Sequence, residues 1–345
     1  MLKTSLLLST GTAILFALSV VPASAQTLGN AAYVEQTGIL NFNYQTQIGG
    51  SGNITDTHQN GMANEAETFQ TDGASNAAYI TQVGTEGVTK QIQARGRNNE
   101  LRVEQYGTGV TNSATQTQNG GERNRAQAAQ NGGGNIVEQT QTQGANNALD
   151  VTQYGDDNRA YQSQLLAIDS SASVLQAGTG NNARQSQSGN ALTATIHQNG
   201  QNGRAVQAQT GTGHIADVEQ FGDLHAAFQT QHGTANEATI LQTGAIHTAH
   251  QMQRGTANEA TILQTGSLHT AHQYQNGSSN IANAEQHGNG GLGHWSEQRQ
   301  VGNNNYASFY QDGHGNGVTQ YQAGNNHHAS AVQLGMVNRS TQTQR

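Results

Sequence analysis

The sequence is short of the residues that hold ordinary globular domains together. Its 345 residues include no cysteine and one proline, and only 33% are hydrophobic, 10% charged and 5% aromatic. An average globular chain is about 45–50% apolar and about 25% charged, so this composition excludes a conventional two-domain enzyme. The lack of cysteine excludes a disulfide scaffold. A net charge of −8 excludes the basic surface of a typical nucleic-acid-binding protein.

The one long apolar stretch lies at the start of the chain. Lys3 supplies a positive charge, Leu6 to Val21 an apolar segment, and residues 23–25 (Ala-Ser-Ala) a small-residue cleavage site. This order is typical of a secretory signal peptide. We therefore predict that residues 1–25 are removed and that residues 26–345 form one secreted repeat domain. After residue 25 no apolar run approaches the roughly 18 residues that a membrane helix needs.

A polar, glycine-rich chain is disordered when its composition has no pattern, but here glutamine recurs at a fixed period. The steps are 22 or 23 residues, with two of 25. The first series consists of Gln36, Gln59, Gln82, Gln105, Gln130, Gln153, Gln176, Gln198, Gln220, Gln242, Gln264, Gln286, Gln311 and Gln333. A second series, from Gln47 to Gln344, lies between them. The chain therefore consists of about fourteen repeats of two halves each.

Fixed and variable residues alternate within each half-repeat, which is the pattern of a β-strand with one face toward a core. Two positions before the first glutamine, the residue is apolar in nearly every repeat, as at Val34 and Ile240. In the second half the same position is nearly always glutamine, as at Gln251 and Gln273. We predict that both fixed faces point inward and that the glutamine amides form ladders along the axis.

Glycine stands two residues after every glutamine of the first series, which indicates a tight turn after each strand. Two short strands cannot bury a face alone, so each repeat must stack on its neighbours. The predicted fold class is all-β, a β-solenoid of about fourteen two-strand repeats of 22–23 residues. Both ends are expected to be uncapped, which leaves strand edges free for head-to-tail growth.

The repeat resembles a known family. Segments 236–244 and 247–255 read Asn-x-Ala-x-Ile-x-Gln-x-Gly and His-x-Ala-x-Gln-x-Gln-x-Gly. This pattern resembles the curlin repeat of bacterial curli fibre subunits, and it covers residues 30–345. The resemblance implies a structural subunit that polymerises into extracellular amyloid fibres on the bacterial cell surface, with roles in biofilm, adhesion and aggregation. It also implies self-association, a curli-type nucleator and an outer-membrane export pore as partners.

One function of a different class stays open, a monomeric secreted β-solenoid that acts as an adhesin or binds a ligand or surface. Such a protein needs one outward column that stays regular over many coils. Thr239 and Thr261 repeat in this way, but Asp217 and Asn283 occupy the same column in the flanking coils.

Enzyme activity is not expected, and neither are a cofactor and catalytic residues. Segments 178–183 and 211–216 match the dinucleotide-binding pattern G-x-G-x-x-A. Both fall on predicted turns, with no helix to present its N-terminus to a pyrophosphate, so we exclude that function.

Among the residues of the repeat, histidine is the candidate for binding a metal ion. His225, His247, His269 and His294 occupy a position that is asparagine in most other repeats, and they should stack one coil apart. Imidazoles at this spacing are weak candidates for zinc or copper ligands. The alternative is that histidine replaces asparagine as a hydrogen-bonding residue beside the turn.

Overall fold

A computed structural model describes residues 29–107, 110–288 and 291–345. These residues form 28 strands and no helix, which confirms the predicted fold class of an all-β solenoid with two strands per repeat. No segment of the described chain is a helix long and apolar enough to cross a membrane. The predicted signal peptide lies outside the described residues.

The chain divides into two compact units, with Leu175 the last residue of the first and Gln176 the first residue of the second. Strand β13 (Ser171–Thr179) contains the division. In the first unit one parallel sheet has the order β1 (Ala31–Ile39), β3 (Ile54–Met62), β5 (Ala77–Thr85), β7 (Glu100–Gly107), β9 (Arg125–Asn131) and β11 (Ala148–Asp156). The other parallel sheet has the order β2 (Phe42–Ile48), β4 (Glu65–Thr71), β6 (Val88–Ala94), β8 (Ser113–Asn119), β10 (Ile136–Thr142) and β12 (Arg159–Leu165).

The second unit repeats this arrangement. One sheet has the order β15 (Thr193–Gln201), β17 (Ile215–Asp223), β19 (Glu237–Ala245), β21 (Glu259–Ser267), β23 (Ile281–Gly288), β25 (Tyr306–His314) and β27 (His328–Met336). The other has the order β14 (Asn182–Asn190), β16 (Arg204–Thr212), β18 (Ala226–Thr234), β20 (Thr248–Thr256), β22 (Thr270–Ser278), β24 (Trp295–Asn303), β26 (Gly317–Asn325) and β28 (Arg339–Gln344).

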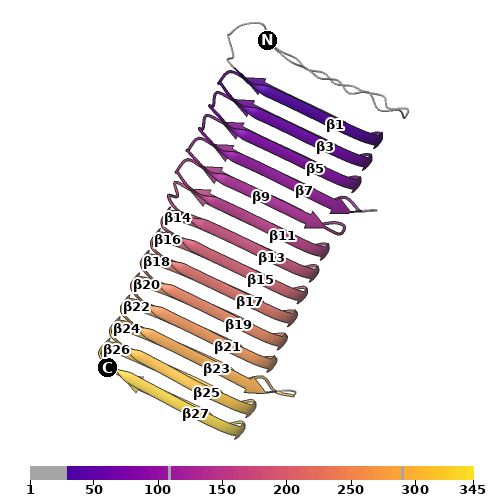
Figure 1. Ribbon diagram of the computed structural model, residues 1–345. Helices are drawn as coiled ribbons and strands as arrows, with labels where there is room; N and C mark the ends of the chain where they lie inside the picture. The colour runs from indigo at the N-terminus through magenta and orange to yellow at the C-terminus, as the bar shows by residue number, and fades with distance from the viewer. Residues whose placement is uncertain (1–28, 108–109, 289–290) are drawn as a thin grey trace. The chain divides into compact units, whose positions relative to one another are not determined.

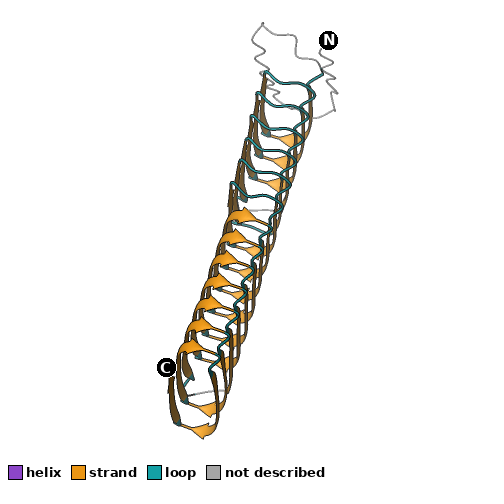
Figure 2. Cartoon of the chain, turned by 90° about the vertical axis from the view of Figure 1, so that its left-hand side faces the viewer, coloured by secondary structure: helices purple, strands orange, loops and turns teal. Residues whose placement is uncertain are grey.

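Each strand pairs with the strand of the same half-repeat in the next coil, so equivalent residues lie side by side. Between β19 and β21, for example, Ile240 pairs with Ile262 and Gln242 with Gln264. Within each unit the strands of one sheet run in the same direction (Figure 1). The two sheets face each other across a narrow interior and are joined by turns (Figure 2). Every coil therefore places its fixed residues in columns along the axis.

The interior is built from small aliphatic residues and glutamine. Ala238, Ile240 and Gln242 of β19 are fully buried, as are Gln251 and Gln253 of β20 to within 2%. Burying an isoleucine side chain stabilises a fold by about 1.5–3 kcal/mol. Because few large apolar side chains contribute, the remaining stability must come from the polar columns and from backbone pairing.

Each coil has two connections between its strands, and one of these connections differs between the two units. In the first unit Gln70 lies six residues before Asn76, whereas in the second unit the equivalent Gln231 lies five residues before Asn236. The extra residue makes a further parallel bridge from coil to coil, which joins Ser51, Ala74, Arg97, Glu122, Ala145 and Ile168. The repeats of 23 residues are thus three-cornered coils, and the repeats of 22 residues are two-cornered coils.

Candidate functional site

The first glutamine series forms a continuous hydrogen-bonded ladder within each unit. Each Nε2 donates to the Oε1 of the glutamine one coil further along, over 2.5–3.0 Å in the first unit and 2.7–2.9 Å in the second. All members are buried except Gln36, which is half-buried in the first coil. We call this column the first ladder.

The second half-repeat supplies two more ladders of the same kind. In one, Gln229 donates to Gln251 and Gln251 to Gln273, both over 2.9 Å. In the other, Gln231 donates to Gln253 over 2.9 Å. The second N–H of each amide bonds the facing sheet, since Gln251 Nε2 also donates to the backbone oxygen of Thr239 over 2.9 Å. The ladders therefore join successive coils and also join the two sheets.

Replacing one ladder glutamine with leucine is expected to cost more than shortening an apolar neighbour. In the Gln251→Leu variant, one N–H of Gln229 and the Oε1 of Gln273 lose their partners, and a buried unpaired polar group costs about 1–3 kcal/mol. Ile240→Val, the matched control, removes one methylene and should cost about 0.5–1.5 kcal/mol. Urea unfolding of both variants measures the difference. A Gln251→Leu protein as stable as the wild type would show that the amide column contributes nothing to stability.

The four histidines stack face to face in the second unit. Ring centroids are 5.0 Å apart between His225 and His247, 4.9 Å between His247 and His269, and 4.7 Å between His269 and His294, with the planes within 8° of parallel. All four rings are at most 1% exposed. The sequence therefore placed them correctly in one column, and the structure adds that this column is buried.

Both nitrogens of each ring are used in hydrogen bonds. His247 Nδ1 accepts from the backbone N–H of His269 over 3.2 Å, and His247 Nε2 donates to the Thr243 oxygen over 3.1 Å. Because a backbone N–H is a donor, Nδ1 must be unprotonated and the proton must lie on Nε2. His225, His269 and His294 repeat this pattern.

In the coil after His294, an asparagine makes the same two hydrogen bonds as the histidines. Asn316 donates from Nδ2 to the Asp312 oxygen over 3.0 Å and accepts at Oδ1 from the N–H of Asn338 over 2.9 Å. An imidazole therefore replaces a carboxamide with its donor and acceptor in equivalent places. Neither ring nitrogen keeps a lone pair for zinc or copper, and the described residues contain no cluster of three metal-ligating side chains. The geometry favours the hydrogen-bonding alternative.

Burial holds the four rings in the neutral form. It lowers the pKa of His247 to about 3 and the pKa of His269 to about 4, and the neighbouring rings of the stack lower both values further. Burial also lowers the pKa of His225 and of His294. Protonation would additionally place an Nδ1–H against a backbone N–H. The stack is therefore an uncharged structural column at neutral pH.

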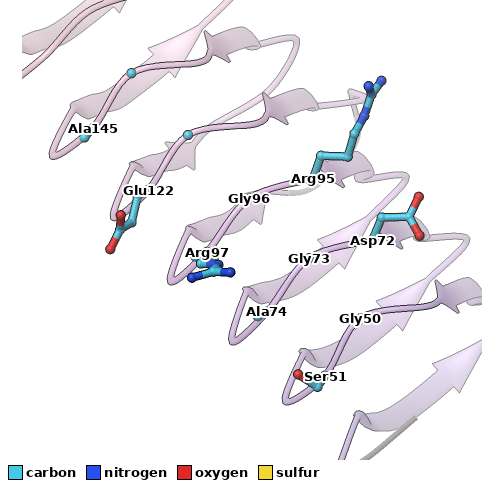
Figure 3. A pocket seen from close by; sticks show the side chains of 12 residues that line it. Gly50, Ser51, Asp72, Gly73, Ala74, Arg95, Gly96, Arg97, Glu122 and Ala145 are labelled. Carbon is cyan, nitrogen blue, oxygen red and sulfur yellow. The ribbon is translucent and has the colours of Figure 1, made fainter. Parts of the chain in front are cut away.

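The longer turns of the first unit border a shallow hollow (Figure 3). Its lining is mainly glycine and alanine, with the charged residues Asp72, Arg95, Arg97 and Glu122 on successive turns. These four side chains extend away from one another in Figure 3. The backbone N–H groups of the corner are bonded to the next coil, as from Ala74 to the Gly96 oxygen over 2.9 Å. The hollow therefore brings together no set of groups for catalysis.

Comparison with known protein families identifies which repeat these coils resemble. The curlin associated repeat matches residues 144–178 and 253–288. These two segments contain curlin repeats. The second matched segment contains β21, β22 and β23, so the match extends over more than one coil, with its glycine turns and ladder glutamines. Curlin repeats belong to structural proteins of extracellular fibres, which fits a solenoid made of stacked coils. No curated protein matches the sequence.

Sequence reasoning missed the third corner of the first unit. The signal was present, because the glutamine steps shorten from 23 to 22 residues after Gln176. That change coincides with the division between the units. Spacing alone does not reveal that the additional residue pairs with its neighbours, so the bridge column from Ser51 to Ile168 was not predicted.

Proposed function

We propose that this chain is a structural subunit that polymerises head to tail into extracellular, curli-like amyloid fibres of the biofilm matrix. The observation that supports it most is the common direction of the ladders. In each one, Nε2 donates toward the C-terminal coil. Among the described residues, Gln333 uses one N–H on the Gly317 oxygen and has no partner for the other, and Gln36 Oε1 has no donor. A donor end of one copy thus matches an acceptor end of the next.

The outermost described strands have the exposure of unfinished coils. Val34 in β1 is 44% exposed, although Ile240 at the same position of β19 is fully buried. In β28 the inward residues Ser340, Gln342 and Gln344 are half-buried, whereas their counterparts in β26 are buried. Unpaired strand edges of this kind promote pairing with another chain. A second copy stacked on either edge would complete the burial.

The proposal extends to export and partners. The predicted signal peptide at residues 1–25 supports secretion. A curli-type nucleator, an outer-membrane export pore and roles in cell adhesion follow from the family resemblance. The second candidate function, a monomeric adhesin or surface-binding solenoid, requires that the mature chain stay monomeric.

The direct test is the assembly of purified residues 26–345. We expect Thioflavin-positive fibres after a lag, and we expect preformed fibres to remove that lag, because stacking on an existing end needs no nucleus. Light scattering and electron microscopy check that the dye reports fibres. A chain that stays monomeric over days at high concentration would contradict the proposal and favour the adhesin.

A proline at a strand edge is expected to stop growth at that end. In a parallel pair, alternate N–H groups face opposite sides. Ala31 N–H faces β3, because it donates to the Asn53 oxygen, so Ala32 N–H faces the open edge. Ala32→Pro therefore removes a donor needed by an incoming copy without breaking a bond within the chain. We expect seeded elongation to fall at least tenfold.

The control for this experiment is Ala32→Val, which changes the side chain but keeps the N–H. It should elongate within about twofold of the wild type. Circular dichroism and urea unfolding establish that both soluble variants are folded. Wild-type elongation by the Ala32→Pro chain would show that β1 is not a growth edge.

A further inference from the structure

One turn edge of the second unit carries a line of exposed apolar side chains. Leu224, Ile246, Leu268, Leu292 and Val337 are 53%, 47%, 44%, 61% and 59% exposed. All five lie in turns between a strand of one sheet and the next strand of the other. We call these five residues the apolar ridge.

The ridge residues lie on successive coils, with one gap at Gly315. Leu268 N–H donates to the oxygen of Ala245, the residue before Ile246, over 3.1 Å. Gly315 fills the position between Leu292 and Val337, and a side-chain carbon there would lie 3.2 Å from Leu292 Cβ and 3.7 Å from Val337 Cγ2. His225, His247 and His269 each directly follow a ridge residue in sequence, and their rings are 4.9–5.0 Å apart. The ridge therefore has the spacing of the coils.

The fold does not require apolar residues at these positions. Leu224, Ile246, Leu268 and Val337 have φ between +56° and +65°, a region that large and β-branched side chains strongly disfavour. Asparagine tolerates it, and Asn202 occupies the position one coil before Leu224 with φ +56°.

The opposite turn edge of the same unit is an internal comparison. Its equivalent residues are small or polar, and they are Ala191, Gly213, Ala235, Ala257, Ser279, Asn304 and Asn326. Both turn edges place a residue with positive φ between two strands. Only the apolar ridge has large apolar side chains at this position, and these side chains are exposed. A contact made by that edge explains the combination, because both costs are then offset by burial.

We propose that the apolar ridge is the lateral interface for a second copy of this chain, so that two solenoids lie ridge against ridge along the fibre. A partner that touches every ridge residue must repeat with the same spacing, and a second copy does so. The turns beside the ridge carry little charge, since Asp223 is followed one and two coils later by Ala245 and Ser267. Two copies therefore meet little like-charge repulsion at Ile246 and Leu268.

The size of the ridge explains why pairing would accompany assembly. A stable complex of two proteins buries about 800 Å² on each partner, and five half-exposed side chains fall short of that. Copies already stacked end to end add their ridges into one long interface. This inference rests on the proposed fibre function, and it predicts paired fibres from chains that are single in solution.

The test replaces ridge residues with asparagine, the residue that other turns use. Leu224→Asn, Ile246→Asn, Leu268→Asn and Val337→Asn are combined in one chain. We expect seeded elongation within about twofold of the wild type, and a twofold lower mass per unit length by scanning transmission electron microscopy. The matched control places asparagine at Ala235, Ala257 and Ser279 on the opposite edge, and it should keep the wild-type mass per length. Unchanged mass per length in the ridge variant would overturn the inference.

A second measurement detects the contact chemically, because the chain has no cysteine of its own and an introduced thiol is unique. Leu268 lies at the middle of the ridge, so Leu268→Cys chains paired ridge to ridge bring the two thiols together. We expect mild oxidation during assembly to give at least tenfold more disulfide-linked dimer than Ala257→Cys on the opposite edge. Equal yields would contradict pairing. A wild type that forms no fibres contradicts the fibre proposal, whereas wild-type fibres with equal dimer yields from the two cysteine variants contradict the pairing alone. Single wild-type fibres that bind phosphatidylcholine vesicles through the ridge would overturn pairing in favour of lipid.

Discussion

Gly211→Ala is expected to destabilise the second unit by about 4 kcal/mol, a sum of backbone strain and overpacking. Gly211 has φ +132°, which side chains with a Cβ do not adopt without strain. A Cβ at this position would also meet the carbonyl oxygen of Gly233 in the next coil far inside van der Waals contact. The turn cannot yield locally, because Gly233 is in the same position relative to Gly255.

Gly213→Ala, two residues further on, is the matched control. Gly213 has φ +68°, and a Cβ there would have its nearest neighbours at 3.9 Å. Ala235 and Ala257 already occupy the equivalent position in the next two coils with φ +53°. We therefore expect a change below about 1 kcal/mol. Urea unfolding monitored by circular dichroism compares the two variants, and equal stability would show that the glycine column is not needed for close stacking of the coils.

Replacing His225, His247, His269 and His294 with asparagine is expected to make the stability of the fold less sensitive to acid. Burial lowers the pKa of His247 to about 3 and that of His269 to about 4, compared with about 6.5 in the unfolded chain. The unfolded chain therefore binds more protons at low pH. This contribution to stability is complete at neutral pH and decreases as the pH falls below about 6.5.

The expected effect is large because several rings act together. Between pH 7 and pH 5, His247 and His269 should each lose about 2 kcal/mol of stability. Protonation of carboxylates opposes this loss by reducing the negative net charge of the chain, but the asparagine variant shares that effect. We expect the variant to be about 4 kcal/mol more stable than the wild type at pH 5, relative to their difference at pH 7.5. Urea unfolding at both pH values measures it.

An exposed pair provides the control for the histidine experiment. His232 and His328 lie on exposed positions, so replacing them with asparagine makes the same chemical change outside the buried column. Parallel pH profiles for the wild type and the fourfold variant would mean that the buried rings do not contribute to acid sensitivity.

The sequence predicts the strands and the polar columns well because each column residue recurs at the same step. Gln242 and Gln251 have side chains that alternate with variable residues, so their inward direction follows from the two-residue period of a strand. The tautomer of His247 could not be predicted in this way. It is determined by the backbone N–H of His269, which belongs to the next coil, and only the register between coils brings the two together.

Turn residues are harder to predict than strand residues. Leu224 and Ile246 have no periodic partner within their own strand, and asparagine, alanine and leucine all occur at equivalent positions. Their positive φ and exposure depend on the path of the chain between the sheets. The apolar ridge therefore emerges only from the structure, although its residues are visible in the sequence.

The near identity of two neighbouring coils has a consequence for the gene. Residues 234–255 and 256–277 differ at four of 22 positions, and each coil bonds only to the coils on either side. Loss of one such segment by recombination would bring Gln220 against Gln264 with the same donor and acceptor, and a duplication would add a coil equally well. The number of coils can therefore change in single genetic steps of 66 nucleotides, about three for each of the 22 residues, without a compensating mutation elsewhere.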